Sequence, residues 1–414
     1  MKDVDAAWIN KMDLQAGVHR SAMNADCPVS GEGHENLLNA VHRALPGLRR
    51  IARDAEVAEK FPICGVDILR RLGLLAAPLP RNRGGNGWGT EGNATLFEAL
   101  RLLGSASLVL GRVYEGHVNA IRLIACYASP EIAMHAAKDV LGGHLFAIWV
   151  TPSADPVRIH CTERGYRVIG KKPFCSGAGQ ATRAVITARD DLGDDRLVWV
   201  DAGKAIVEPD SAIQMHGMRS TDTRPVRFDM DIDTDPIIGK AADYLREPEF
   251  SAGAWRTSAV TVGGLQALVT ETIAQLRARD RHVAPHQSAR IGQMLIASHT
   301  ALMWGRKAAS EAERTDLPPQ SITAGVNLAR VAIESCCLTV IPLVQRSLGL
   351  AGLLTSNPVE SMIRDLATYL RQPAADEALS EAACWFAENG FGDNEVSAQP
   401  EATTCQGAGG AGVI

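Results

Sequence analysis

The sequence lacks the cysteine patterns that mark a metal site or a disulfide framework. Its nine cysteines include no Cys-x-x-Cys pair, and their positions form no even framework. We therefore expect reduced, mostly buried thiols and no metal site.

A dense run of basic residues is also lacking, and the formal net charge at pH 7 is -5. The one arginine-rich stretch, His42–Arg53, carries apolar Leu45, Leu48 and Ile51 between its arginines. This spacing indicates an amphipathic helix whose basic face is solvated, and not a surface that follows phosphates. Nucleic acid is therefore excluded as an expected partner.

Long apolar runs are missing too. Residues 1–15 mix charged and polar side chains with single hydrophobic ones, and we find no run near the roughly 18 apolar residues of a membrane helix. We expect a cytoplasmic protein without a membrane span. At 414 residues and 46% hydrophobic content, the chain is long enough for two or three domains.

Periodicity divides the chain into segments. Apolar residues recur at helical spacing from Glu35, alternate as in strands after Gly143, and return to helical spacing from Ala254. The predicted fold class is α+β, mainly α, with a helical domain, a small central β-barrel or sandwich, and a four-helix bundle. The expected bounds are 1–34 for an N-terminal arm, 35–142 for the N-terminal helical domain, 143–245 for the β domain, 246–390 for the C-terminal bundle and 391–414 for a flexible tail.

Three local features have structural and functional interpretations. Gly165–Gly179 begins with a turn glycine and an alternating segment, which predicts a β-hairpin. The glycine-rich loop Arg81–Gly92 lacks the Gly-Lys-Ser/Thr ending of a phosphate-binding loop, so we expect a structural bend. His117 lies in a nearly all-apolar helical stretch, which favours a buried, hydrogen-bonded histidine.

This order of segments, together with four motifs, resembles the acyl-CoA dehydrogenase superfamily of flavoproteins over roughly residues 35–370. The motifs are the loop Gly73–Pro80 with Gly84–Gly87, the hairpin Gly165–Gly179, the Gly-x-Arg-x-Thr element Gly217–Thr221, and the Pro-x-Glu-x-x-x-Arg-Asp segment Pro358–Asp365. The resemblance implies FAD bound between the β domain and the bundle.

The resemblance also implies which residues face the flavin. Phe174 takes the position of an aromatic ring beside the isoalloxazine, and Ser176 that of a hydroxyl near N5. Trp149 and Thr151 match the family's strand motif more loosely and are further candidates. The structural alternative is that Phe174 belongs to the core and Ser176 to a turn.

Members of the family pass an arginine and a glycine loop to the FAD of a neighbouring subunit, which implies a homodimer or homotetramer. Arg277, Arg279 and Arg281 are the candidates for the pyrophosphate, because a guanidinium fork suits phosphate oxygens. A solvated helix end is the alternative for Arg277 and Arg279. The glycine loop corresponds to Gly349 and Gly352, with Gln345 or Arg346 at its Gln position.

The sequence departs from the family at the catalytic base. The family's Glu falls on Pro373, and the alternative position at the start of the first bundle helix falls at about Trp255-Arg256. A carboxylate in a dry pocket is what proton removal beside a thioester carbonyl requires. Asp376 is the nearest candidate base, and we expect Glu247 and Glu249 to be surface charges.

The leading functional prediction is an FAD-dependent oxidoreductase that acts on a CH–CH group and transfers hydride from an acyl thioester, carried by CoA or an acyl carrier, to FAD. An alternative is a flavin-dependent monooxygenase or N-hydroxylase of the same superfamily, which needs no such Glu. A third is a non-catalytic homologue that keeps the fold for binding.

Overall fold

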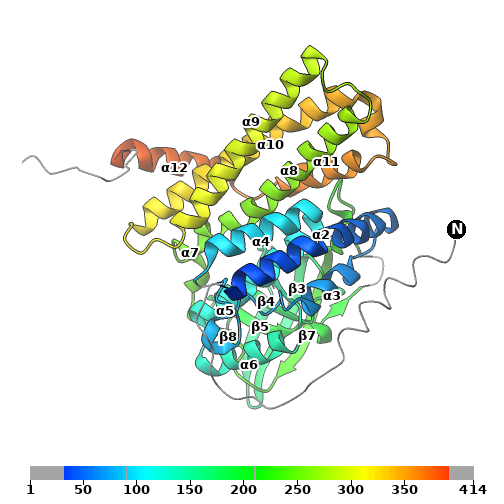
Figure 1. Cartoon of the computed structure of the whole chain (residues 1–414). Helices are drawn as coiled ribbons and strands as arrows, with labels where there is room; N and C mark the ends of the chain where they lie inside the picture. The colour runs from blue at the N-terminus through cyan, green and yellow to red at the C-terminus, as the bar shows by residue number, and fades with distance from the viewer. Residues whose placement is uncertain (1–31, 90, 209–210, 391–414) are drawn as a thin grey trace, which may run out of the picture.

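The computed structural model describes residues 32–89, 91–208 and 211–390. The predicted tail, most of the predicted arm, and residues Cys27 and Cys405 lie outside these ranges. The structure begins with a set of helices, passes through a group of strands and ends in long helices, in the predicted order (Figure 1).

The N-terminal helices are α2 (Glu32–Ala58), α3 (Ile63–Arg71), α4 (Asn93–Ala106), α5 (Leu108–Tyr127) and α6 (Pro130–Leu141). The C-terminal helices are α7 (Glu249–Ala252), α8 (Ala254–Arg277), α9 (Pro285–Glu311), α10 (Pro319–Leu348), α11 (Pro358–Tyr369) and α12 (Ala375–Asn389). In Figure 1 the bundle α8–α11 lies at one end of the molecule and the strands at the other, with α2 and α4 between them.

The strands are β1 (Phe146–Trp149), β2 (Arg158–Thr162), β3 (Gly165–Cys175), β4 (Arg183–Arg189), β5 (Asp195–Asp201), β6 (Ile206–Val207), β7 (Arg224–Ile232) and β8 (Ile237–Ile238). They form one mixed sheet in the order β6-β7-β3-β2-β4-β5-β8, and β1 pairs in parallel with β4. Buried apolar side chains that alternate along β3, β4, β5 and β7 form a core of their own.

The prediction of two strands within Gly165–Gly179 is wrong, whereas the turn expected at the start of this segment is present and joins β2 to β3. Residues Gly165–Cys175 form a single strand, which pairs antiparallel with β2 on one side and β7 on the other. Gly170, with a φ of +135°, is not at a turn: a Cβ there would lie 2.7 Å from Cα of Val157. The glycine therefore serves a close approach of two backbone segments within the sheet.

The largest core joins the two helical parts of the chain. Helix α4 packs along α8, and apolar residues of α2–α5 share one cluster with α8–α11. Helix α5 is buried over most of its surface, and Ser107 caps its first turn by accepting a hydrogen bond from the Leu110 amide at 3.3 Å. Polar side chains on α5 are therefore held in a fixed, largely dry environment.

The glycine-rich loop after α3 folds back on the preceding chain. The amide of Gly87 donates to the carbonyl of Leu79 at 2.8 Å, the amide of Trp88 donates to Ala77 at 3.1 Å, and the Trp88 side chain is fully buried. These contacts agree with the predicted structural bend.

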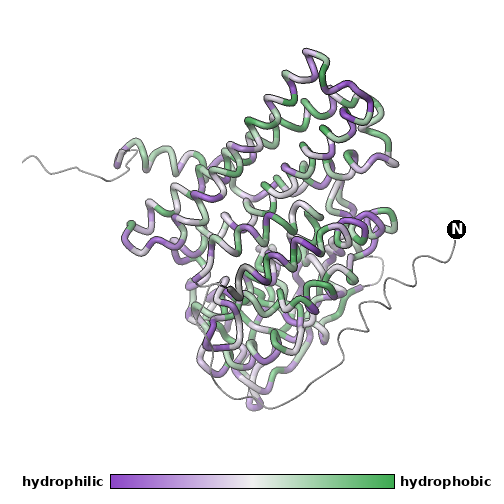
Figure 2. Tube along the Cα trace, viewed as in Figure 1, coloured by the Kyte–Doolittle hydropathy of each residue, from purple (hydrophilic) through white to green (hydrophobic). Residues whose placement is uncertain are grey.

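One helical segment, Pro319–Leu353, is long and apolar enough to span a membrane by length and composition, which the sequence analysis did not anticipate. In the fold α10 packs against α8, α9 and α12, and 39% of its most apolar window is buried. Figure 2 shows hydrophobic residues running through the bundle helices, as expected of helices that share a core.

Seven cysteines lie in the described ranges, and all seven are free thiols. Cys64, Cys126, Cys161 and Cys384 are exposed, so the prediction of mostly buried thiols is wrong. Within the same ranges no group of three or more His, Cys, Asp or Glu side chains is arranged to hold a metal ion.

Candidate functional site

A cavity of about 240 Å³ lies between α5, the start of α8 and the loop that joins α11 to α12. Both positions at which the resemblance places a catalytic base line this cavity: Arg256 from α8 and Pro373 from the loop. Sites 117 residues apart in the chain thus meet at one place, but neither carries a carboxylate. A smaller hollow of about 20 Å³ shares Ile148 with the cavity and reaches Ser176 and Gly177.

Helix α5 contributes a polar stripe at helical spacing, made of Arg112, Glu115 and Asn119. The Glu115 side chain is 3% exposed, pairs with the Arg112 guanidinium, and accepts hydrogen bonds from Asn119 Nδ2 and, at 3.3 Å, from Thr257 Oγ1 of α8. Glu115 and burial act in opposite directions on Arg112, and the net effect raises the pKa of its guanidinium. The stripe ties α5 to the start of α8.

Glu249 also lines the cavity. Arg122 holds it through two hydrogen bonds, of 2.6 Å from Nη2 and 3.2 Å from Nε, while Nη1 of the same arginine donates to the carbonyl of Gly89 at 2.7 Å. The prediction that Glu249 is a surface charge is therefore wrong, because its carboxylate is held in an ion pair at the cavity wall. Glu247 is exposed, and accepts hydrogen bonds from the Ser251 amide at 3.1 Å and from Thr323 Oγ1 at 3.0 Å.

Arg256 is the most deeply placed cation of the cavity wall, with 8% of the residue exposed. Its Nε donates to Asn119 Oδ1, and its guanidinium carbon lies 5.5 Å from the centre of the Trp255 ring. Burial and the neighbouring Arg122 lower the pKa of Arg256 to about 10, so it remains charged at neutral pH.

Asp376, the predicted base, lies in the first turn of α12 and is exposed. It is not among the residues that line the cavity, although Gln372 and Pro373 of the preceding loop are. Its catalytic role stays a prediction that the cavity geometry does not support.

The predicted flavin-facing residues lie near the end of β3. Phe174 is 54% exposed, and Ser176 Oγ lies 3.2 Å from Thr223 Oγ1. Trp149 is buried in the core of the sheet and donates from Nε1 to the Ser176 carbonyl at 3.0 Å, so it positions the chain at Ser176 from within. Thr151 is exposed, and the buried Lys172 holds its carbonyl at 3.3 Å.

The residues predicted to reach a neighbouring subunit lie at the ends of bundle helices. Arg277 and Arg279 are exposed at the end of α8, and Arg346 is exposed near the end of α10. Gly349 begins the short helix η5 (Gly349–Leu353) with a φ of +60°, which favours glycine. Gly352 is buried against Leu348. In one chain these residues form no common site with Phe174 and Ser176.

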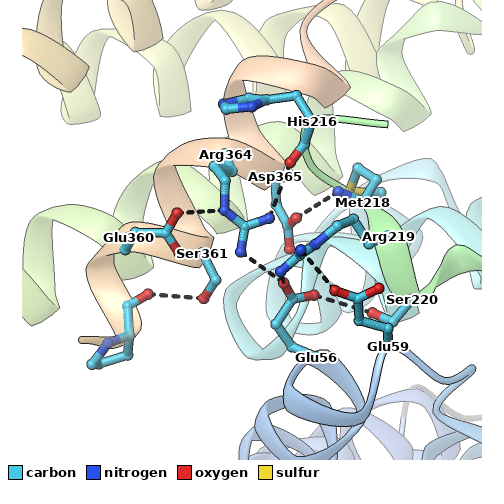
Figure 3. A network of polar contacts seen from close by, with 11 residues as sticks. Glu56, Glu59, His216, Met218, Arg219, Ser220, Glu360, Ser361, Arg364 and Asp365 are labelled. Carbon is cyan, nitrogen blue, oxygen red and sulfur yellow. Dashed lines mark hydrogen bonds and ion pairs between the residues drawn. The ribbon is translucent and has the colours of Figure 1, made fainter. Parts of the chain in front are cut away.

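Two of the four motifs meet in a polar network whose residues do not line the cavity (Figure 3). Glu56 of α2 accepts hydrogen bonds from Arg364 at 2.8 Å and from Arg219 at 3.1 Å, and Asp365 accepts one from the Met218 amide at 2.6 Å. Burial is the largest single effect on Glu56 and raises its pKa, but the two arginines together outweigh it and lower the pKa. The network joins α2, the loop before β7 and α11, so these motifs serve the fold.

His117 is fully buried, as predicted. Its Nε2 donates to the carbonyl of Leu75 at 2.8 Å, while Nδ1 accepts from the Phe146 amide at 3.1 Å, which fixes a neutral imidazole. Burial lowers the pKa of His117 to about 4.

Comparison with known proteins identifies the fold to which this site belongs. No family model matches the chain. Amino sugar nitrososynthase DnmZ from Streptomyces peucetius is 24% identical over 391 residues, which are 83% of this chain and 91% of that protein. The structure of butyryl-CoA dehydrogenase from Megasphaera elsdenii superposes with a TM-score of 0.75 at 15% identity, and covers 88% of this chain and 100% of that one. The chain has the acyl-CoA dehydrogenase fold.

FMN-bound TdsC from Paenibacillus sp. A11-2 has the same fold, with a TM-score of 0.74, 20% identity, and coverage of 86% of this chain and 98% of that one. A second structure of TdsC is described as a dibenzothiophene monooxygenase. The resemblance inferred from the motifs and the predicted fold class are confirmed.

Within the acyl-CoA dehydrogenase fold, the residues near Ser176 fit a planar aromatic cofactor. Phe174 is exposed two residues before Ser176, and Ser176 with Gly177 lines the hollow that adjoins the cavity. An exposed ring beside small residues gives a flat apolar face that a bound isoalloxazine would cover.

Sequence reasoning missed most of the cavity wall, including the polar residues Glu115, Asn119, Thr257 and Arg330. The available signal was the helical spacing of Arg112, Glu115 and Asn119 in a largely apolar helix, where charged residues are costly unless paired.

Proposed function

We propose that the protein is a flavin-dependent oxidoreductase that oxygenates a small polar molecule. The observation that carries this proposal is the cavity where both base positions meet, because it presents Arg256 and Pro373 in place of a carboxylate. When bound and reduced, a flavin supplies the chemistry that activates dioxygen, and this chemistry does not require a protein carboxylate to remove a substrate proton.

The remaining carboxylates of the cavity wall also favour this reaction class. Within the described ranges they are Glu115 and Glu249, and each is ion-paired with an arginine of α5. The oxygens of both carboxylates are therefore engaged by arginine nitrogens, and neither is free to approach a substrate proton. The names of DnmZ, a nitrososynthase, and TdsC, a monooxygenase, agree with oxidation at groups other than CH–CH.

We propose FAD as the flavin, as the motifs imply, with Phe174, Ser176 and Thr151 beside its ring and Trp149 supporting them. Arg277, Arg279, Arg346, Gly349 and Gly352 would contact the FAD of a neighbouring subunit. TdsC is FMN-bound, so the cofactor must be identified directly. Release of the flavin by denaturation, followed by mass determination, distinguishes FAD from FMN.

Hydride transfer from an acyl thioester is the second candidate. It is favoured by one observation, the buried Glu115 carboxylate on the cavity wall, which could act as base if substrate displaced Arg112. In this case Glu115→Gln should abolish flavin bleaching by the acyl thioester.

One set of measurements distinguishes oxygenation, dehydrogenation and a non-catalytic role. Oxygen consumption that depends on an added flavin reductase and a substrate, without anaerobic bleaching by a panel of acyl-CoA thioesters, is the expected result. Bleaching by a thioester would contradict the oxygenase proposal and favour dehydrogenation. Protein that takes up neither FAD nor FMN would contradict both and favour a non-catalytic homologue.

We also propose a homodimer or homotetramer. Large apolar side chains are exposed along α9, α10 and η5, namely Leu295, Ile296, Met303, Leu338, Leu350 and Leu353. Such a surface favours burial against another subunit. Light scattering coupled to size-exclusion chromatography should give at least twice the mass of the chain, and a monomer at micromolar concentration would contradict the proposal.

A further inference from the structure

The cavity at the base positions contains more positive than negative charge once its ion pairs are counted. Glu115 is paired with Arg112, and Glu249 is paired with Arg122. Two further arginines line the same cavity, Arg256 and Arg330, and neither forms an ion pair with a described carboxylate.

Each of these two arginines has N–H groups that donate no hydrogen bond to any residue in the described ranges. Arg256, a residue more than nine-tenths buried, uses only Nε, toward Asn119. Its two terminal nitrogens have no hydrogen-bond partner in the described ranges and face the cavity. Arg330 donates from Nη2 to the carbonyl of Pro373, and its Nε is buried without a partner. Burial of an unpaired guanidinium is unfavourable, so a ligand that accepts these hydrogen bonds would be stabilised.

We infer that the cavity binds an oxyanion of the substrate, a carboxylate or a phosphate, through the terminal nitrogens of Arg256, with Arg330 as the second cation. A guanidinium fork matches two oxygens of either group. The inference rests on the proposed function in taking this cavity as the substrate site, and it specifies the class of substrate as a small anionic molecule.

The size of the cavity agrees with a small ligand. Its volume of about 240 Å³ corresponds to roughly eight water molecules at about 30 Å³ each. A four-carbon dicarboxylate is of this order, whereas the space is smaller than the pockets that hold drug-sized ligands. The charge on Arg256 persists at neutral pH, since burial lowers the pKa of its guanidinium only to about 10.

Calorimetric titration of the flavin-loaded protein tests the inference with three probes: succinate, inorganic phosphate and the neutral succinamide. We expect saturable binding of at least one anion and none of succinamide. Arg256→Gln should weaken that binding about tenfold or more, because hydrogen bonds to charged groups contribute at least this factor. Arg256→Lys keeps the positive charge but loses the guanidinium fork, so its anion affinity should lie between those of Arg256→Gln and the unaltered protein.

Arg371→Gln is the matched control. Arg371 lies in the loop between α11 and α12 that also contains Pro373. It is ion-paired with Glu334 and is not among the residues that line the cavity. The Arg371→Gln variant should bind the anions with the same affinity as the unaltered protein. If Arg256→Gln lowers the melting temperature, Arg330→Gln and Arg256→Lys decide instead, with weaker binding expected in both.

The inference is overturned if neither anion binds, if succinamide binds as tightly as succinate, or if the Arg256 and Arg330 variants bind the anions unchanged. Flavin absorbance on the same samples separates this result from failure of the proposed function. Protein that oxygenates a neutral substrate but binds no anion contradicts the inference alone. Protein that binds succinate through Arg256 but takes up no flavin contradicts the proposed function and keeps the anion site.

Discussion

Replacing Asp365 by Asn should remove a pH dependence of stability that originates in the network of Figure 3. Asp365 lines a groove of about 690 Å³ and accepts a hydrogen bond from the Met218 amide at 2.6 Å. Burial raises the pKa of its carboxyl from 3.8 to about 7, against the opposing effect of that amide. Asparagine keeps an acceptor for the amide but cannot ionise.

The sign and size of the expected change in stability follow from the linkage between proton binding and folding. Because the pKa is higher in the folded state, the carboxyl's contribution to stability is fully present below pH 3.8 and is lost as the pH rises through about 7. A rise from 3.8 to about 7 corresponds to at most about 4 kcal/mol. Solvent in the groove that Asp365 lines screens the charge of its carboxylate, so we expect about 2 kcal/mol.

Urea unfolding of both proteins between pH 4.5 and pH 8.5 measures this difference. The free energy of unfolding of Asp365→Asn, relative to the unaltered protein, should rise by about 2 kcal/mol across that range. The other charged groups of the network, Glu56, Arg219 and Arg364, are the same in both proteins and cancel in the difference. Parallel profiles, or a relative loss of stability in the variant at high pH, would show that the arginines stabilise an ionised Asp365 and refute the reasoning.

Three further outcomes are expected. Gly217→Ala should destabilise the fold by about 2 kcal/mol in urea unfolding, because its Cβ would lie 2.1 Å from a backbone oxygen of α11, whereas Gly292→Ala on an open helix face should not. Phe174→Ala should weaken flavin binding up to about tenfold in a fluorescence titration, while Ile169→Ala on the same strand leaves it unchanged. Asp376→Asn should leave turnover within about twofold, since the residue is exposed and outside the cavity; a large loss would identify it as the base.

Much of the helical architecture could be predicted from the sequence because the apolar spacing of bundle helices is local information. Helix α11 is an example, because its buried residues Val359, Ile363 and Leu366 recur at helical spacing. The strand at Gly165–Cys175 could not be predicted in this way. Gly170 has the same sequence signature at a turn and at a close backbone approach, and only the position of Val157 decides between them.

The candidate site shows the same limit. Motif matching proposed Phe174 and Ser176, which are near in the chain, but the cavity wall combines α5, α8, α10 and the loop after α11. Arg330 had no local signal, since an arginine on a bundle helix resembles a solvated one. Its unpaired, buried Nε is a property of the tertiary packing against Pro373.

The motif that gives the strongest resemblance carries the least information about the reaction. Arg364 and Asp365 join α11 to Glu56 and Met218, and none of these residues lines the cavity. Any chain that needs this junction of three segments would keep the motif, whatever chemistry it performs. The two positions at which the family pattern is broken, Arg256 and Pro373, instead meet at one cavity. The reaction is therefore to be inferred from the departures, where a cation and a proline stand in place of the carboxylate base and line the cavity that we propose to bind an anion.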